Sequence, residues 1–300
     1  MVRYARTGGE ANAIAIRLAR AASGKDKIAI CGYHGWHDWY LSANLNSNNS
    51  EGVLKDHLLP GLSTKGVPKN LKNTIYPFKF NDFNALKKIC DQNKIGAIKM
   101  EVFRNIPPEK NFLEKVRKLA DKKNIVLIFD ECTSGFRQTY GGIHKVYGIE
   151  PDMMMLGKAL GNGYAITAVL GKKEIMESIN KTFISSTFWT ERSGPAAALK
   201  TLEIMEKTKS WIYITKLKKF IKNYWKKLAK KHKINIKING IDALCSFVFE
   251  SKYHQEYKTF ITQEMLKNNI LASNVVYVSV SHNKNLLNKY FKILDKIFNT

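Results

Sequence analysis

Two residues of this 300-residue chain combine a reactive side chain with an unusual position. Asp130 follows the apolar run IVLIF, which predicts a carboxylate at the end of a buried strand, where open α/β sheets hold their ligands. Lys158 follows the run MMML after a single glycine and precedes the glycine-bearing turn ALGNG. Most lysines keep their ammonium group in water, so a lysine beside a buried strand end is unusual. A desolvated amine of this kind suits imine formation with a carbonyl group.

A third segment, Thr7-Gly8-Gly9-Glu10, directly precedes an Ala-rich stretch of helical character. Backbone N–H groups at a helix start hold a phosphate against the positive end of the helix dipole. Taken singly, Asp130 could cap a helix or form a structural ion pair, and a Gly-Gly pair is usually just a turn. Together, an amine, a carboxylate and a phosphate site match the aldehyde, ring nitrogen and phosphate ester of pyridoxal 5'-phosphate.

The elements that would position these groups predict an α/β fold. Continuous apolar strands that alternate with helices indicate a mostly parallel sheet covered by helices on both faces. The strand-like runs are residues 27–31, 95–102, 124–129, 153–156 and 165–170, and the helical patterns are residues 10–23 and 112–123.

The pattern changes after residue 193. Helices are predicted at 194–207, around 214–233 and at 256–267, strands at 234–239 and 243–250, and a last strand and helix close the chain. We therefore predict a large α/β domain over residues 1–205 and a smaller C-terminal α+β domain over residues 206–300.

The formal net charge of +24 raises the question of a polyanionic partner. The densest basic stretch, residues 216–233, contains apolar residues at steps of three and four, which is the buried stripe of an amphipathic helix. These residues are Ile214, Leu217, Ile221, Tyr224 and Leu228. The lysines then form its solvated face, and we expect no nucleic-acid partner.

The composition also bears on where the protein acts. No stretch approaches the roughly 20 uncharged apolar residues that a membrane helix needs, and the first residues lack the apolar block of a signal peptide. The four cysteines lie far apart without C-x-x-C spacing, so we expect reduced thiols and no structural metal. We therefore expect a cytoplasmic protein with no membrane partner.

Five segments resemble the class III pyridoxal-phosphate-dependent aminotransferases, and most closely their glutamate-1-semialdehyde 2,1-aminomutase-like branch. The resemblance covers essentially the whole chain and implies the fold-type-I transferase fold, with a large domain and a smaller C-terminal domain. It also implies a small-molecule amino or keto substrate. The segments are TGGEAN (7–12), CGYHGWHD (31–38), LIFDECTSGFR (127–137), YGIEPDMMMLGKALGNGY (147–164) and SSTFWTERSGPAAAL (185–199).

The resemblance implies a role for several residues. Lys158 would form the imine with the cofactor, and Asp130 would accept a hydrogen bond from its ring nitrogen. The implied cofactor contacts are Gly8 and Gly9 at the phosphate, Tyr33 on one ring face, Cys132 on the other, and Thr187 at the phosphate of the neighbouring subunit of a homodimer.

Other polar residues carry weaker signals. His34 and His37 could suggest a metal site, but no further donor stands at a telling spacing, so we expect packing and hydrogen bonding around Tyr33. Glu101 ends a predicted strand, and Asn105 stands near a family cofactor contact with an altered offset. The roles of these two residues stay open.

The chain departs from the family pattern in three places. It starts just before the phosphate turn, where the family has a further N-terminal portion, and it reads GNGY after Lys158 and TFWTERSGP around Thr187. We expect general amino transfer; the alternatives are a true glutamate-1-semialdehyde 2,1-aminomutase of tetrapyrrole synthesis, and an inactive fragment or cationic binding protein.

Overall fold

The computed structural model describes residues 1–46, 53–54, 62–103 and 105–300. The chain divides into two compact units by its internal contacts. The first comprises Met1–Val102, Pro108–Phe136 and Gly141–Ile204, and the second comprises Phe103–Pro107, Arg137–Tyr140 and Met205–Thr300. Two short segments within the predicted large domain thus pack with the second unit.

The first unit is built on a seven-stranded sheet among the described residues, in the order β1-β7-β6-β5-β4-β2-β3. The strands from β2 to β6 run parallel to their neighbours, whereas β7 is antiparallel to both β6 and β1. Their bounds are β1 Val2–Ala5, β2 Lys27–Cys31, β3 Ile75–Pro77, β4 Ile95–Met100, β5 Val126–Asp130, β6 Met153–Leu156 and β7 Thr167–Gly171. The predicted mostly parallel sheet is confirmed.

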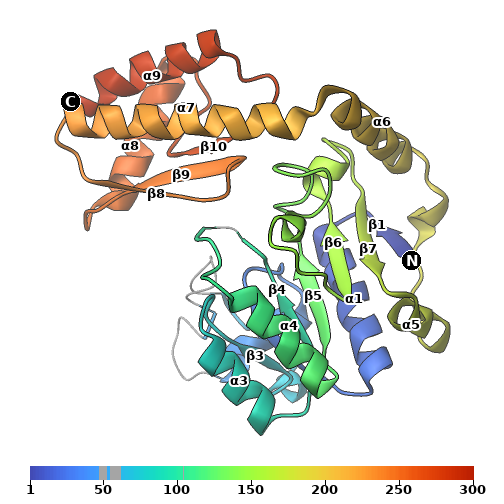
Figure 1. Cartoon of the computed structure of the whole chain (residues 1–300). Coiled ribbons are helices and arrows are strands. Elements are labelled where there is room, and N and C mark those ends of the chain that lie inside the picture. Colours follow the sequence, from blue (N-terminus) through green and yellow to red (C-terminus); the bar gives the residue numbers. More distant parts are fainter. Residues whose placement is uncertain (47–52, 55–61, 104) are drawn as a thin grey trace. The chain divides into compact units, whose positions relative to one another are not determined.

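Helix α1 (Gly8–Ser23) covers one face of this sheet, and α3 (Phe83–Gln92) and α4 (Phe112–Lys123) cover the other (Figure 1). Thr7 caps α1 by accepting a hydrogen bond from the Glu10 backbone, and Gly24 ends the helix in the left-handed conformation that glycine favours. Small alanines at every fourth position let α1 lie close to the strands. These are Ala11, Ala15 and Ala19, all fully buried.

Several short elements complete the first unit, and the chain passes from the first unit to the second within helix α6. They are the helices α2 (Asp38–Leu41) and α5 (Lys173–Met176), the 3₁₀ turns η1 (Ser42–Asn46), η2 (Lys69–Leu71), η3 (Ile143–Val146), η4 (Lys158–Leu160), η5 (Glu177–Lys181) and η6 (Thr187–Thr190), and α6 (Ser193–Thr208).

The second unit is an antiparallel sheet in the order β10-β9-β8 packed with three helices. The basic helix α7 buries four of the five residues of the predicted apolar stripe, Ile214, Leu217, Ile221 and Leu228. The fifth, Tyr224, is half-buried and stacks on Phe291 at 4.1 Å between ring centroids, and Trp225, which the prediction did not include, is fully buried. The element bounds are β8 Ile236–Asn239, β9 Leu244–Phe249, β10 Val275–Tyr277, α7 Ser210–Lys231, α8 His254–Lys267 and α9 Lys284–Phe298.

The two short segments join the second unit through hydrogen bonds. The Gly240 N–H donates to the Asn105 carbonyl at 2.8 Å, and the Asp242 N–H donates to Gln138 Oε1 at 2.7 Å. Asn105, whose role the sequence left open, therefore holds the loop between β8 and β9.

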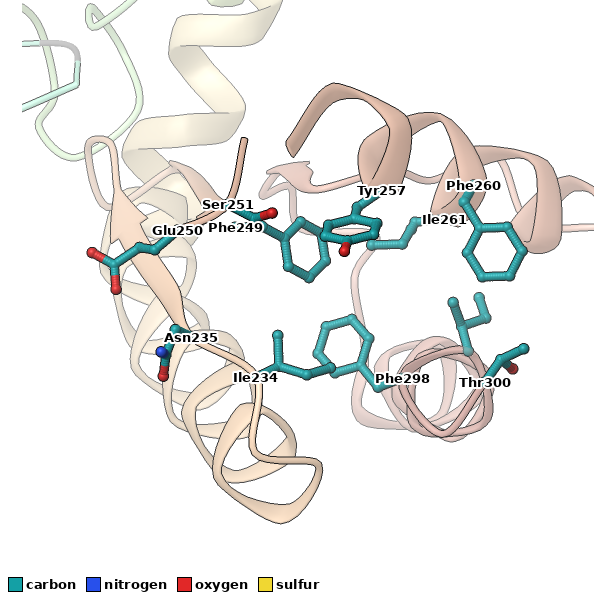
Figure 2. Close-up of a pocket in the computed structure, with 11 residues that line it drawn as sticks. Ile234, Asn235, Phe249, Glu250, Ser251, Tyr257, Phe260, Ile261, Phe298 and Thr300 are labelled. Carbon is teal, nitrogen blue, oxygen red and sulfur yellow. The ribbon is translucent and has the colours of Figure 1, made fainter. Parts of the chain in front are cut away.

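The second unit also contains an apolar pocket of about 570 Å³ between β9, α8 and α9 (Figure 2). Phe249, Tyr257, Phe260 and Phe298 line it, while Glu250 lies at one side. None of the residues predicted to carry chemistry belongs to this pocket. Within the described ranges, no helix combines the length and apolar character needed to cross a membrane.

Candidate active site

Asp130 and Lys158 stand at the ends of two neighbouring parallel strands. Asp130 is the last residue of β5 and lies beside Met155 of β6 in the strand register. β6 ends at Leu156, and the chain then passes through Gly157 to Lys158. Because parallel strands end at the same edge of a sheet, the carboxylate and the amine reach the same edge, where ligands of such sheets bind.

Lys158 is exposed and begins the turn η4 with a φ of +44°, a left-handed conformation that is uncommon for a residue other than glycine. Its Nζ donates to the Thr133 hydroxyl at 2.9 Å. Gly157 allows this turn to approach its neighbours closely, since a β-carbon there would lie 2.9 Å from Thr167 Cγ2 and 3.5 Å from Cys132 Sγ. The amine is therefore held at a defined position beside the end of β5.

Asp130 is a buried carboxylate with two strong donors on one oxygen. His34 Nδ1 lies 2.9 Å and Lys99 Nζ 2.8 Å from Asp130 Oδ2. Burial alone would raise the pKa of Asp130, but the charge of Lys99 and the hydrogen bonds from His34 and Lys99 outweigh it and hold the pKa well below its ordinary value. Asp130 is therefore an anion throughout the neutral range.

Lys99 and His34 were not among the predicted site residues. Lys99 lies on β4 and is completely buried, and His34 follows β2. The sequence signal for Lys99 was a single charged residue inside the apolar strand IGAIKM. A lysine in a sheet that is covered on both faces is buried, and a buried ammonium group requires an anionic partner. His34 was predicted to pack and form hydrogen bonds around Tyr33, and its ring hydrogen-bonds to Asp130.

Cys132 lies beside the carboxylate. Its backbone N–H donates to Asp130 Oδ1 at 3.3 Å, and its side chain is 7% exposed. Burial, reinforced by the charge of Asp130, raises the pKa of the Cys132 thiol. The thiol therefore stays protonated at neutral pH, which suits a small apolar wall and not a nucleophile.

The start of α1 belongs to the same region of the first unit. The Thr167 hydroxyl, at the first residue of β7, donates to the Thr7 carbonyl at 3.2 Å. A β-carbon on Gly9 would lie only 2.2 Å from His37 Cε1, whereas one on Gly8 would meet nothing within 4 Å. Gly9 thus permits an imidazole to pack directly on the helix start. The N–H groups of Glu10 and Ala11 donate to Thr7, so those of Gly8 and Gly9 are the ones that this turn offers to an anion among the described contacts.

Tyr33 is half-buried in the loop after β2. Its backbone N–H donates to Glu101 Oε2 at 3.2 Å, and its ring meets Tyr40 edge to face at 6.1 Å. A β-carbon on Gly32, which has a φ of +107°, would lie 2.6 Å from the same Glu101 oxygen. Glu101 therefore fixes the backbone that presents Tyr33.

Thr187 is exposed on η6. Among the described residues, no hydrogen bond joins it to Lys158 or Asp130. Its predicted contact concerns a second subunit, so the role of Thr187 stays a prediction.

The comparisons with known proteins fit this arrangement. A family model described as aminotransferase class-III matches residues 1–297. The chain belongs to this family. One curated relative of this class III aminotransferase is the 3-aminobutyryl-CoA aminotransferase of Cloacimonas acidaminovorans, which is 40% identical over 69% of this chain and 47% of its own length. Another is the glutamate-1-semialdehyde 2,1-aminomutase of Nitrosopumilus maritimus, 34% identical over 96% of this chain and 72% of its own length.

The fold has close counterparts among solved structures. The FumI protein of Sphingopyxis sp. MTA144, solved in its PLP internal aldimine form, superposes with a TM-score of 0.86 over 99% of this chain and 70% of its own. The two sequences are 21% identical, so this likeness concerns the fold. The matched portion is thus about half the length of the first relative and roughly 70% of the others. The predicted family and the predicted fold class are confirmed.

Proposed function

We propose that this class III aminotransferase binds pyridoxal 5'-phosphate and moves an amino group on small amino or keto compounds. The observation that carries the proposal is the pairing of the ionised Asp130 with the positioned amine of Lys158 at the ends of adjacent strands. The carboxylate and the amine have separate partners, so the carboxylate can serve the basic ring nitrogen of the cofactor and the amine its aldehyde.

The residues present fit this cofactor. Lys158 would hold the aldehyde, Asp130 Oδ1 would accept from the ring nitrogen, and the N–H groups after Thr7 at the start of α1 would hold the phosphate. The cofactor, when bound, supplies an electron sink for the charge left when a substrate proton departs. Asn12 lies in the first turns of α1, and its Oδ1 is buried without a hydrogen-bond partner among the described residues. This part of α1 therefore has a hydrogen-bond acceptor that is not used.

The faces of the ring would be covered by two further residues. We assign one face to Tyr33, which the Glu101 contact presents, and the other to Cys132, whose protonated thiol is small and apolar. Gly8 and Gly9 belong to the phosphate turn. Tyr33 and Cys132 would shield the ring faces from water.

Lys158 has a second part in the reaction. Its Nζ would remove a proton from the substrate and return it, as general base and acid. The Thr133 hydroxyl, which accepts a hydrogen bond from Nζ at 2.9 Å, helps to fix the position of this amine. This matters for the rate, because an amine that is already held beside the substrate needs little further orientation.

The two relatives catalyse different reactions by name, so two reactions are candidates for this chain. We infer general amino transfer between two compounds, and the second candidate is the intramolecular reaction of an aminomutase, which the relative from Nitrosopumilus maritimus favours. A mutase needs no second substrate, whereas a transaminase stalls in the pyridoxamine form without an amino acceptor. Turnover of glutamate-1-semialdehyde without any added acceptor would therefore separate the two.

We further propose a cytoplasmic homodimer. The exposed position of Thr187 on η6 is compatible with a contact to the phosphate of the neighbouring subunit. All four cysteines are free and buried, which agrees with a reducing compartment. Sedimentation of the purified chain with and without cofactor would test the dimer.

The decisive experiment traps the cofactor. The purified chain is incubated with pyridoxal 5'-phosphate, reduced with borohydride and mapped by peptide mass spectrometry, beside Lys158→Gln and the surface variant Lys172→Gln. We expect one modified lysine, Lys158, in the wild-type chain and in Lys172→Gln, and none at this position in Lys158→Gln. Modification spread over surface lysines, with salt-sensitive retention on polyanions, would instead favour a cationic binding protein.

A further inference from the structure

Lys99 has no part in the reaction as proposed so far, yet it occupies a costly position. The side chain is completely buried on β4, and its Nζ contacts Asp130 Oδ2 at 2.8 Å and Met155 Sδ at 3.2 Å. Burying an ammonium group requires a partner that compensates the lost hydration. Asp130 supplies that compensation, so the two side chains form one buried unit.

The two oxygens of Asp130 are used unequally. Oδ2 receives Lys99 Nζ and His34 Nδ1, whereas Oδ1 receives the Cys132 N–H at the longer distance of 3.3 Å. Oδ1 therefore has the spare capacity for a ring N–H. The donors on Oδ2 fix the carboxylate plane, so the free lone pair of Oδ1 has a defined direction before any cofactor arrives.

The charge on Asp130 is already compensated without a cofactor. Lys99 contributes a positive charge, and both ring nitrogens of His34 face oxygen acceptors, Asp130 Oδ2 and the Cys31 carbonyl at 3.2 Å. Only the doubly protonated imidazole donates to both acceptors. A further cation, such as a protonated ring nitrogen, would then meet a carboxylate whose charge is shared and an ammonium that repels it.

We propose that Lys99 is a positioning residue that orients Asp130 and limits how strongly Asp130 holds a proton on the cofactor ring nitrogen. This inference rests on the proposed function, because it concerns the ring that Asp130 would contact. Lys99 thereby sets the electron withdrawal that the site can enforce, without touching substrate or cofactor.

The remaining groups around Asp130 do not cancel this effect. Cys132 stays a neutral thiol, because burial and the Asp130 charge raise its pKa. Lys158, on the turn after β6, donates to the Thr133 hydroxyl at 2.9 Å and not to Asp130. The described contacts of Asp130 therefore place the Lys99 ammonium group from β4 and the His34 imidazole from the loop after β2 against one carboxylate.

The test compares two ligands that differ only at the ring nitrogen. The affinities of the cofactor-free chain for pyridoxal 5'-phosphate and for its 1-deaza analogue, which has C–H in place of the nitrogen, give a preference ratio. We expect Lys99→Met to raise this ratio by about tenfold or more, since one unit of proton affinity is a factor of ten. Lys27→Met is the matched control, because Lys27 lies on the neighbouring strand β2 and its Nζ contacts Asn93 at 3.0 Å. Its ratio should equal that of the wild type.

A purely structural role for Lys99 would weaken both ligands equally and leave the ratio unchanged, which would overturn the inference. If Lys99→Met fails to fold, Lys99→Gln removes the charge while keeping a donor and is expected to raise the ratio in the same direction. The wild-type chain offers an independent measurement with ¹⁵N-labelled cofactor. The ring nitrogen should lose its proton at a lower pH in the wild-type chain than in Lys99→Met, and loss at the same or a higher pH in the wild type would also overturn the inference.

The two proposals fail in different ways. Absence of trapped cofactor at Lys158 in the wild-type chain would overturn the proposed function and this inference with it. Normal trapping at Lys158 combined with an unchanged ratio in both Lys99 variants would overturn only the role of Lys99.

Discussion

Lys99 Nζ lies 2.8 Å from Asp130 Oδ2 in the interior of the first unit, where Lys99 is completely buried and Asp130 is 6% exposed. Each charge is tolerable there because the other is present. Removing one partner of a buried pair leaves an uncompensated charge and costs roughly 3–5 kcal/mol. Removing both leaves an apolar side chain and a neutral amide, which the interior accommodates more easily.

We therefore expect the stability effects of Lys99→Met and Asp130→Asn to be strongly non-additive. Each single variant should lose about 3 kcal/mol of unfolding free energy, and the double variant should lose at least about 2 kcal/mol less than the sum. Urea unfolding of the cofactor-free chain measures these values. The exposed pair Lys87 and Asp91 serves as control, because its removal should cost under about 1 kcal/mol. Additive losses at Lys99 and Asp130 would contradict the pairing.

Much of the first unit could be predicted from periodicity alone. Helix α4 begins and ends where its pattern predicts, and β2 and β6 coincide with their apolar runs. Among the described strands and α-helices of the first unit, those that were not predicted are β1, β3, α2, α3 and α5. Strand β1 is a four-residue edge strand, and β3 has three residues and ends in proline, so neither offers enough residues for a pattern.

The candidate site was predictable where a residue stands at the end of its own strand. Asp130 and Lys158 carry that signal in their local sequence. The contact between Lys99 and Asp130 depends instead on β4 lying next to β5 and on their register, in which Lys99 faces Ile128. Local periodicity does not encode strand order, so the pair emerges only from the three-dimensional arrangement.

The next prediction concerns the amine. Lys158→Gln should reduce amino transfer by about 10²–10⁴-fold or more, because it removes the group that moves the proton as well as the cofactor attachment. Its melting temperature should change by no more than about 2 °C, since the side chain is exposed and donates to a single hydroxyl, that of Thr133. Thr133→Val should reduce the rate about tenfold while retaining borohydride trapping at Lys158. Full activity in Lys158→Gln would rule out the assigned role.

The depressed pKa of Asp130 predicts how stability depends on pH. A carboxyl whose pKa is lower in the folded state contributes stability that is present above its unfolded value, near 3.8, and is lost as the pH falls towards the folded pKa. The stability difference between wild type and Asp130→Asn should thus be constant above about pH 5 and shrink below pH 3.8. Chemical unfolding at a series of pH values measures the difference. A gap that stays constant down to the lowest pH at which both chains fold would contradict the ionised state of Asp130.

Cys132 should react slowly with thiol reagents despite its place in the site. Its side chain is buried, and burial together with the Asp130 charge raises its pKa, so the thiolate is scarce at neutral pH. In the native cofactor-free chain, labelling by iodoacetamide at pH 8 should be at least about tenfold slower than for a free cysteine peptide. Cys132→Ala should keep trapping at Lys158, because the thiol serves as a small wall. Rapid labelling would show that the thiolate is accessible.

Gly9 tests the phosphate turn separately from the rest of the site. A β-carbon there would lie 2.2 Å from His37 Cε1, so Gly9→Ala must displace the imidazole from the start of α1. We expect this variant to bind pyridoxal 5'-phosphate at least about tenfold more weakly, while pyridoxal, which lacks the phosphate, binds as it does to the wild type. The double variant Gly9→Ala, His37→Ala removes the clash and should recover part of the lost affinity. Equal losses for both ligands would mean that this turn supports the fold of the site and does not hold the phosphate.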